Sequence, residues 1–389
     1  MATGWLNRNV LLISFSAFFA DLGYQTAIAI FPIFLVTVLK APTYEFGIAN
    51  AVAFGIGSLF GYMGGLMSDR FGDKRISILG NAFIPLLSLM GLAVSPAVAI
   101  LLFSGGWWAR NFRSPARRAM LVRSSSRADR SRSFGFLHML DIGGGLLSIV
   151  ILLALVSAML SFKYILLLTI IPLAVSTSLL AFTKRSAKAK AAVQKGSGTP
   201  GARAAGASTY KGIIIATALY GFSYYSLGFP ILTIAQRSGS LLGIGSYGVY
   251  LGVSAVVGYY IGSRKRINRI RALALVGYAL SGLGTLLLGV GYLFGSGDIV
   301  LYAAVAVLGF ALGVIETLEP TIISFIKGAG ELGRGMGSLT ASRSIGIFSA
   351  NLIMGLLYVV SPFYSYSYAG VVSLAAGLIV FAYGRKFSG

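Results

Sequence analysis

The stretch Gly65-Leu66-Met67-Ser68-Asp69-Arg70-Phe71-Gly72-Asp73-Lys74-Arg75 lies between two long apolar runs. It has glycines at its entry and at its tip, and its charged residues stand at fixed offsets. If each apolar run is a helix, a polar segment this short is a tight hairpin between two neighbouring membrane helices. The stretch therefore predicts an all-α membrane protein in which consecutive helices lie side by side.

Composition supports a membrane protein and excludes several classes of site. Of 389 residues, 56% are hydrophobic and 11% are charged, and the mean hydropathy is +0.83, whereas soluble domains carry about 25% charged residues. The chain has no cysteine and one histidine, His138, which excludes disulfides, thiol catalysis and metal sites built from cysteine or several histidines. We therefore expect no cofactor, no metal and no enzymatic activity. The first apolar run, from Val10, is too long for a signal peptide core, so we expect it to remain as a membrane helix.

Apolar runs long enough to cross the membrane recur along the whole chain. A helix needs roughly 20 apolar residues to cross about 30 Å of hydrocarbon, and these runs are too long for barrel strands. We expect twelve transmembrane helices near residues 10–38, 46–67, 76–94, 97–118, 133–157, 162–182, 211–235, 246–262, 272–294, 299–326, 336–360 and 363–383.

The distribution of Lys and Arg predicts the orientation of these helices. With the N-terminus inside, the outer loops contain Lys40, Lys163 and Arg237, three of the 32 basic residues. This asymmetry is typical of a multi-pass protein of the cytoplasmic membrane with both termini in the cytoplasm. The net charge of +22 then reflects topology and attraction to anionic membrane lipids rather than nucleic-acid binding.

A polar inner linker divides the chain into two halves. Residues 183–210 are rich in Lys, Ala, Gly and Ser, which indicates a flexible segment. We expect an N-terminal six-helix bundle over 1–182 and a C-terminal six-helix bundle over 211–389. A weak internal repeat, Arg132-x-x-Gly135 against Arg334-x-x-Gly337, supports two related halves. Paired repeats are the usual construction of a secondary transporter.

Several charged residues fall inside the expected spans of the first half. A charge at bilayer depth costs several kcal/mol unless it is paired or hydrated, so each is a candidate functional residue. At about 1.5 Å of rise per residue, Asp21, Asp141 and Arg110 reach similar depths, with Arg113 one turn closer to the cytoplasm. We expect Arg110 or Arg113 to pair with Asp141, with Asp21 nearby. These pairs either take part in transport or only hold the helices together.

The second half inverts the signs of these charges. Glu316 and Glu319 are three residues apart and share one helix face, and Arg343 occupies the position that corresponds to Asp141. We expect one of the glutamates to pair with Arg343. By this interpretation, the pairs in the two halves help to hold an inner gate.

Further candidates for the solute and proton pathway are a histidine and three tyrosines. His138 precedes Asp141 by one turn and carries an imidazole, which can gain and lose a proton near neutral pH. It is either a proton relay or a hydrogen-bonded structural group. Tyrosines in the first and seventh spans either line a cavity or pack in the core; these are Tyr24, Tyr220 and Tyr224.

The 65–75 stretch resembles the loop between helices 2 and 3 of the major facilitator superfamily. The family pattern is Gly-x-x-x-Asp-Arg-x-Gly followed by paired basic residues, and Asp73 occupies its free position. The matching positions are Gly65, Asp69, Arg70, Gly72, Lys74 and Arg75. Together with the twelve spans and the central linker, this resemblance covers essentially the whole chain.

Shorter stretches resemble a poorly characterised prokaryotic and archaeal branch of that superfamily. They are Phe19-Ala20-Asp21, Arg113-Ser114-Pro115-Ala116-Arg117 and Arg132-Ser133-Phe134-Gly135-Phe136. The chain departs from the branch at Arg118, where an acid is usual. It also lacks the Gly-Pro step that drug/proton antiporters tend to have in the fifth span. The first departure weakens the expectation of a second local salt bridge, and the second weakens an antiporter interpretation.

The resemblance implies a rocker-switch carrier in which two bundles expose a central site to one side of the membrane at a time. It also implies that Asp69 caps the start of the eleventh helix, and that Arg70 and Arg75 contact inner-loop groups such as Asp129. We expect a monomeric secondary transporter of a small organic solute, driven by protons through Asp21 or Asp141. The alternatives are an uncoupled uniporter of the same fold and a membrane sensor that does not transport.

Overall fold

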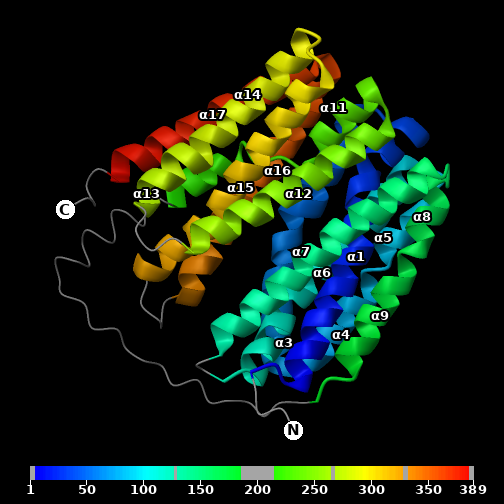
Figure 1. The fold of residues 1–389 in the computed structure, drawn as a ribbon, viewed down its shortest axis with the longest axis vertical. Coiled ribbons are helices and arrows are strands. Elements are labelled where there is room, and N and C mark those ends of the chain that lie inside the picture. Colours follow the sequence, from blue (N-terminus) through cyan, green and yellow to red (C-terminus); the bar gives the residue numbers. More distant parts are fainter. Residues whose placement is uncertain (1–4, 127–128, 185–213, 264–267, 327–331, 385–389) are drawn as a thin grey trace. The chain divides into compact units, whose positions relative to one another are not determined.

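The structure is a computed structural model. It describes residues 5–126, 129–184, 214–263, 268–326 and 332–384, and every regular element in these ranges is a helix. Most of the expected linker 183–210 therefore lies outside the described residues, and the side chain of Arg334 does as well. The elements are drawn in Figure 1.

The chain forms two compact units. The first comprises Met1–Ala41, Val52–Lys190 and Gly239–Gly248, and the second comprises Pro42–Ala51, Ala191–Ser238 and Val249–Gly389. We predicted that the chain divides once, at the linker. The structure differs from this prediction in two short segments. Pro42–Ala51 belongs to the second unit, where it packs against the eleventh predicted span, and Gly239–Gly248 belongs to the first unit.

The first unit is built around its first helix, which contacts α6, α7 and α9 (Figure 1). Asn7 caps this helix by accepting a hydrogen bond from the backbone N–H of Val10 at 3.1 Å. The helices of this unit are α1 (Arg8–Ile33), continued by η1 (Phe34–Val38), α3 (Ile56–Phe71), α4 (Asp73–Phe83), α5 (Leu86–Leu89), η3 (Met90–Leu92), α6 (Pro96–Ser124), α7 (Arg130–Ser157), α8 (Phe162–Leu168) and α9 (Ile170–Ala181).

In the second unit, α14 packs against α15 and α17, and α16 packs against α2 and α17. A helical segment over 214–221 begins the described part of this unit after the linker. Two elements cross the boundary between the units, η2 (Ala51–Gly55) and α12 (Ser240–Ser263). The others are α2 (Thr43–Asn50), α11 (Gly228–Ser238), α13 (Arg269–Ala272), η4 (Leu273–Ala279), α14 (Leu280–Leu293), α15 (Asp298–Ile326), α16 (Leu332–Val360) and α17 (Pro362–Gly384).

Ten helices among the described residues are long and apolar enough to cross a membrane. The two remaining predicted spans are the fourth and the seventh. The fourth is a single helix, α6, but its arginines make it too polar to be counted by composition. The seventh was expected to be continuous over 211–235 and is not, since its helix is interrupted at 222–227. The count of twelve therefore remains a prediction.

The interruption of the seventh span has a local cause. Pro230 has no backbone N–H to donate to the preceding turn, and its ring disfavours helical backbone before it. Backbone groups freed in a membrane need partners, and here Asn351 Oδ1 accepts a hydrogen bond from the backbone N–H of Ser226 at 3.2 Å. An asparagine of α16 thus stabilises the break.

Glycines allow helices of the first unit to approach closely beside the charged residues. A Cβ added at Gly144 of α7 would lie 2.2 Å from the backbone oxygen of Phe18 in α1. One added at Gly80 of α4 would lie 2.9 Å from the Cβ of Arg113 in α6. Small residues at such crossings are typical of membrane helix packing. These two crossings bring α7 to α1 and α4 to α6.

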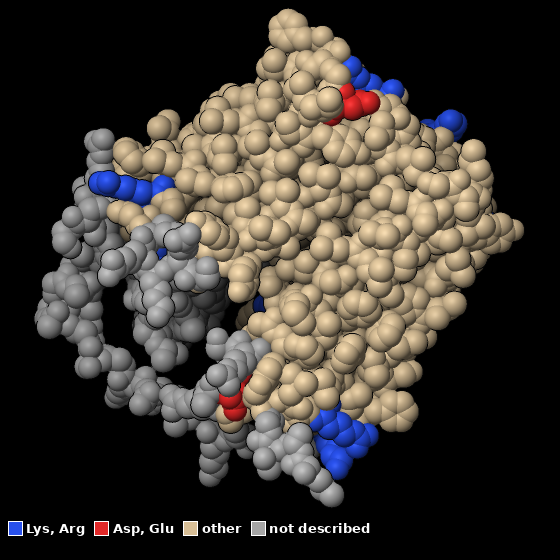
Figure 2. All heavy atoms as spheres, in the orientation of Figure 1, with Lys and Arg blue, Asp and Glu red and all other residues tan. Residues whose placement is uncertain are grey.

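The sides of the helices expose few charged groups. In Figure 2, the visible described residues are mostly uncharged along the helices, and blue Lys and Arg atoms gather at helix ends. Large apolar side chains on these sides are well exposed, among them Leu101 at 70%, Val150 at 63% and Leu378 at 70%. This is the distribution expected of surfaces that face lipid.

Candidate functional site

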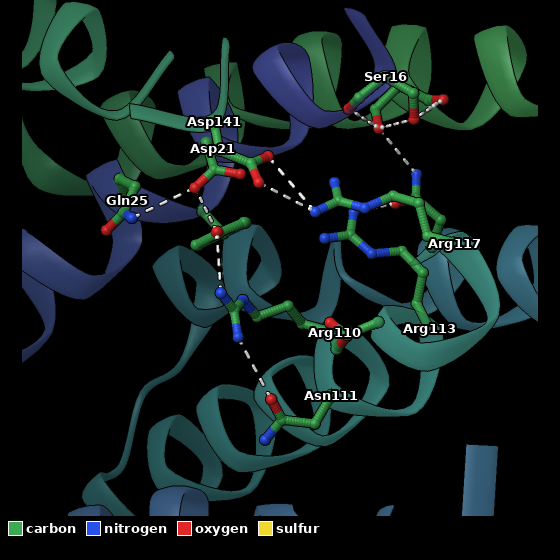
Figure 3. A network of polar contacts seen from close by, with 12 residues as sticks. Ser16, Asp21, Gln25, Arg110, Asn111, Arg113, Arg117 and Asp141 are labelled. Atoms are coloured by element: carbon green, nitrogen blue, oxygen red, sulfur yellow. Dashed lines mark hydrogen bonds and ion pairs between the residues drawn. The ribbon is translucent and has the colours of Figure 1, made fainter. Parts of the chain in front are cut away.

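Three arginines form a stripe on one face of α6. Arg110, Arg113 and Arg117 follow the spacing i, i+3, i+7, which places side chains on one side of a helix. Ser95 caps this helix, and Pro96 occupies its first turn, where a missing N–H has no cost. Figure 3 shows the three guanidinium groups on the side of α6 that faces Asp21 and Asp141.

Arg110 reaches Asp21 through a tyrosine. Tyr24, one turn after Asp21 on α1, donates a hydrogen bond to Asp21 Oδ1 and accepts one from Arg110 Nη2 at 3.2 Å. Gln25 Nε2 also donates to Asp21 Oδ1, at 3.3 Å. The guanidinium of Arg110 lies over the rings of Tyr24 and Trp107, with its Cζ 5.0 Å and 4.6 Å from their centroids. Asp21 is therefore buried among donors, although its Oδ2 has no hydrogen-bond partner among the described residues.

The ion pair of Asp141 is with Arg117. Arg117 Nη2 lies 3.3 Å from both carboxylate oxygens of Asp141. The predicted pairing of Asp141 with Arg110 or Arg113 is wrong. Relative to Arg110, Arg117 is rotated about the helix axis by about 20° and Arg113 by about 60°, so Arg117 shares the face toward α7 while Arg113 turns toward α4.

Arg113 is held by α4 and has no carboxylate partner in the described part of the chain. It is 0% exposed and donates through Nη1 to Asn81 Oδ1. The amide of Asn81 donates in turn to Ser176 Oγ at 3.1 Å and Thr177 Oγ1 at 2.8 Å on α9. Nε and Nη2 of Arg113 have no hydrogen-bond partner within the described ranges. A fully buried guanidinium is thus oriented by an amide but not neutralised by an acid.

The second unit contains a separate ionic cluster with the opposite balance of charge. Arg343 Nη1 lies 2.6 Å from Glu316 Oε1, and Arg343 also contacts Glu319. Glu319 is 0% exposed and also accepts hydrogen bonds from Tyr278 and, at 3.5 Å, from Thr217. The side chain of Glu316 is 52% exposed. One arginine therefore joins two glutamates, of which only one is enclosed.

The 65–75 hairpin is a compact polar cap at one end of the first unit. Gly72 has φ +95°, a conformation that L side chains rarely adopt, and it separates α3 from α4. Asp73, at the pattern's free position, is 8% exposed, pairs with Arg123 Nε at 2.6 Å and accepts a hydrogen bond from Ser68. Lys74 Nζ donates to the carbonyls of Ala181 and Thr183 at 2.7 Å and 2.6 Å, where α9 ends.

The remaining charged residues of this hairpin are more exposed. Asp69, Arg70 and Arg75 are exposed, and the predicted contact of these arginines with Asp129 does not form in the described part of the chain. Asp129 instead accepts a hydrogen bond from Ser126 at 2.6 Å, because it directly precedes α7 and bonds within its own turn. Capping of the eleventh helix by Asp69 remains a prediction, since residues 327–331 before α16 are outside the described ranges.

The predicted histidine and tyrosines differ in environment. His138 is exposed and makes no hydrogen bond to the residues that the structure describes. Tyr24 and Tyr220 are 1% and 4% exposed, so they belong to the packed interior and do not line an open cavity. Tyr220 stacks on Tyr278 with ring centroids 4.5 Å apart. Tyr224 is half-buried, with Arg343 Cζ 5.8 Å from its ring centroid.

Sequence reasoning missed several members of these clusters. Arg117 could have been found from the i, i+3, i+7 spacing on α6, and Asp73 from its place in the first turn of α4. Asn81, Thr217 and Tyr278 carry no comparable signal, because neutral polar residues are common in membrane helices. Within the described ranges, no group of three or more His, Asp or Glu side chains could hold a metal ion.

Comparison with known proteins identifies the family. The family model described as Major Facilitator Superfamily matches residues 13–288, which is more than half of the chain. The chain belongs to the major facilitator superfamily. A search of curated proteins finds no match. Members of this superfamily are transporters rather than enzymes, so the chain is a multi-pass membrane protein with a transporter fold.

Solved structures show the same superfamily fold at low sequence identity. A D-xylose–proton symporter aligns with a TM-score of 0.79 at 12% identity, over 98% of both chains. A POT family transporter in complex with a thioalcohol-conjugated peptide gives 0.79 at 12%, over 98% of this chain and 97% of that chain. A point mutant of the nucleoside transporter NupG gives 0.73 at 13%, over 98% of this chain and 100% of that chain. At these identities the likeness concerns the fold alone.

Proposed function

We propose that the protein is a secondary active transporter that moves a small organic solute across the cytoplasmic membrane by rocker-switch alternating access, coupled to protons. The observation that carries this proposal is the enclosed ionic cluster in the first unit, where Asp21, Arg113 and Arg117 are each less than 10% exposed. Charged groups at this depth in membrane helices are costly, and in transporters they bind solutes and ions. Membership of a transporter family supports the same conclusion.

Asp21 and Asp141 are the proposed proton carriers. They are the acidic members of the cluster and come from different helices, α1 and α7, while both lie near the arginines of α6 (Figure 3). Asp141 is 24% exposed at its side chain, so water can deliver a proton to it. Protonation of Asp141 would remove its attraction to Arg117 and release α7 from α6. A proton is thereby linked to a change in helix contacts.

The 65–75 hairpin is the proposed inner gate. Its backbone turn at Gly72, the Asp73–Arg123 pair and the capping of α9 by Lys74 tie four helices together at one end of the first unit. A rigid end piece allows a helix bundle to move as a body. We also propose that both termini lie in the cytoplasm, on the strength of the basic residues in the inner loops, and that the protein is a monomer.

A solute screen in proteoliposomes tests the proposal. Purified protein is reconstituted into vesicles that enclose a pH-sensitive dye, and amino acids, sugars, nucleosides, organic acids and cationic drugs are added in turn. Coupled transport predicts that at least one solute changes the internal pH as it enters. A uniporter would allow a solute to equilibrate without a pH change. A sensor would bind a solute without moving it, which would refute the proposal.

A further inference from the structure

We propose that the arginine cluster (Arg110, Arg113 and Arg117) binds an anionic group of the transported solute, a carboxylate, phosphate or sulfate. This inference rests on the proposed function and specifies its substrate class. It follows from the balance of charge around the cluster, from the donors left open there, and from the residues that hold those donors in place.

The cluster has more positive than negative charge. Three guanidinium groups face two carboxylates, those of Asp21 and Asp141. One of the carboxylates is paired directly with Arg117, and the other reaches Arg110 through Tyr24. No carboxylate of the described residues lies within ion-pair distance of Arg113. An uncompensated charge in a membrane helix is strongly unfavourable. Binding of an additional anion beside Arg113 is therefore electrostatically favourable.

The open donors belong to all three arginines. Among the buried side-chain nitrogens without a hydrogen-bond partner within the described ranges, five belong to this cluster: Nε of Arg110, Nε and Nη2 of Arg113, and Nε and Nη1 of Arg117. Guanidinium donors lie in a planar fork that matches the oxygens of a carboxylate or phosphate. Water can accept these hydrogen bonds but cannot neutralise the charge. A neutral solute has the same limitation, and a cation would be repelled.

Neighbouring residues hold the cluster ready for a ligand. Asn81 presents its oxygen to Arg113 because its amide nitrogen is committed to Ser176 and Thr177. Arg110 is laid against the rings of Tyr24 and Trp107 and donates to Asn111 Oδ1 at 3.3 Å. Donors that are already oriented lose little entropy on binding. Arg110 and Asp141 are partly exposed, so a solute can approach the cluster from their side.

The proposal can be tested without knowing the solute. Deproteinised small-molecule extract from the cells that produce the protein is passed over an anion-exchange resin, and the retained and unretained fractions are desalted to equal ionic strength. Each fraction is titrated into purified protein while the thermal unfolding temperature is recorded. We expect the retained fraction alone to raise this temperature by several degrees.

Variants assign the effect to the cluster. Arg113→Gln keeps a donor for Asn81 but removes the charge. It should raise the amount of the retained fraction that gives half of the temperature shift by about tenfold or more. Arg237→Gln is the control, because Arg237 lies outside the cluster and donates to the carbonyl of Gly295. If Arg113→Gln does not fold, Arg110→Gln takes its place. Stabilisation by the unretained fraction alone, by neither fraction, or equally in the cluster variant would overturn the proposal.

The outcomes separate this inference from the proposed function. Proton-coupled uptake of an uncharged solute, with no change of the unfolding temperature by the retained fraction, would support the proposed transport function and exclude the anion site. A cluster-dependent response to the retained fraction, with no uptake of the active solute into proteoliposomes, would support the anion site and refute the transporter.

Discussion

At the scale of single residues, the molecule departs from ordinary protein interiors at Arg113. Buried charges are normally paired with an opposite charge, yet this side chain is fully enclosed and, among the described residues, is bonded only to the neutral Asn81. Asn81 would be equally satisfied by a neutral donor. Stability alone does not account for an arginine at this position, whereas binding of an anion does.

The first prediction concerns the stability of the protein without solute. Arg113→Gln removes the desolvation cost of a buried charge that has no carboxylate partner among the described residues, while it keeps an amide donor for Asn81. We expect the thermal unfolding temperature of the solute-free variant to equal or exceed that of the wild type. A fall of many degrees, larger than that of Arg237→Gln, would show that Arg113 is a structural residue.

The second prediction concerns the pair between Arg117 and Asp141. Either single reversal, Arg117→Asp or Asp141→Arg, places like charges in contact and should reduce transport to near background. The double variant with the charges exchanged should recover a measurable part of it, because the attraction is restored. Exchange of Arg113 and Asp141 is the matched control and should stay inactive. Recovery in the control instead would contradict the assigned pair.

At the scale of elements, helix positions and the pairing of Arg343 with the glutamates of α15 followed from the sequence, whereas the partners of the α6 arginines did not. Apolar length determines where a membrane helix runs, and α1, α7 and α17 lie close to their predicted spans. Which arginine of α6 faces α7 depends on the rotation of that helix. The rotation is set by close crossings such as Gly80 with Arg113, which join residues far apart in the chain.

The seventh span illustrates the same limit. Its composition is mostly apolar, so the sequence predicted one continuous helix over 211–235. Pro230 disfavours a continuous helix, but a full interruption needs a partner for the freed backbone groups, and that partner, Asn351, comes from α16. No local pattern around residues 222–227 identifies a partner that lies more than 100 residues away in the chain.

The third prediction concerns the hairpin between α3 and α4. Gly72→Ala forces a side chain into a positive-φ conformation that is largely restricted to glycine, which costs roughly 1–3 kcal/mol, although nothing lies within 4 Å of the added Cβ. We expect a lower unfolding temperature and slower transport. Gly65→Ala is the control, since its Cβ would meet Pro115 at an ordinary 3.8 Å. Equal behaviour of the two variants would contradict a role for the turn.

At the scale of the whole molecule, each unit has its own enclosed ionic cluster, and the two clusters differ in sign. The first has three arginines and two aspartates, and the second has one arginine and two glutamates. The sequence predicted charged pairs in both halves and the inverted signs. It did not predict the surplus positive charge in the first unit, because Arg117 was not recognised as a member of its cluster.

The fourth prediction concerns topology. The chain has no cysteine, so a single introduced cysteine can be labelled without background. A membrane-impermeant maleimide should label Lys40→Cys in intact cells and Ser126→Cys only after lysis. Lys40 follows the predicted outer end of the first span, and Ser126 follows the predicted inner end of the fourth span. The reverse pattern would contradict cytoplasmic termini.

Accumulation driven by a pH gradient tests the central claim most directly. Two sets of proteoliposomes, one alkaline inside and one acidic inside, receive from outside a solute that the screen has identified, and its internal concentration is followed over time. We predict that wild-type protein accumulates the solute above its external concentration in one of the two sets, the first for symport and the second for antiport, and that collapsing the gradient releases it. Asp141→Asn should exchange the solute between the two sides but should not accumulate it. Accumulation by Asp141→Asn equal to that of the wild type, or wild-type uptake that stops at equilibrium, would contradict the account.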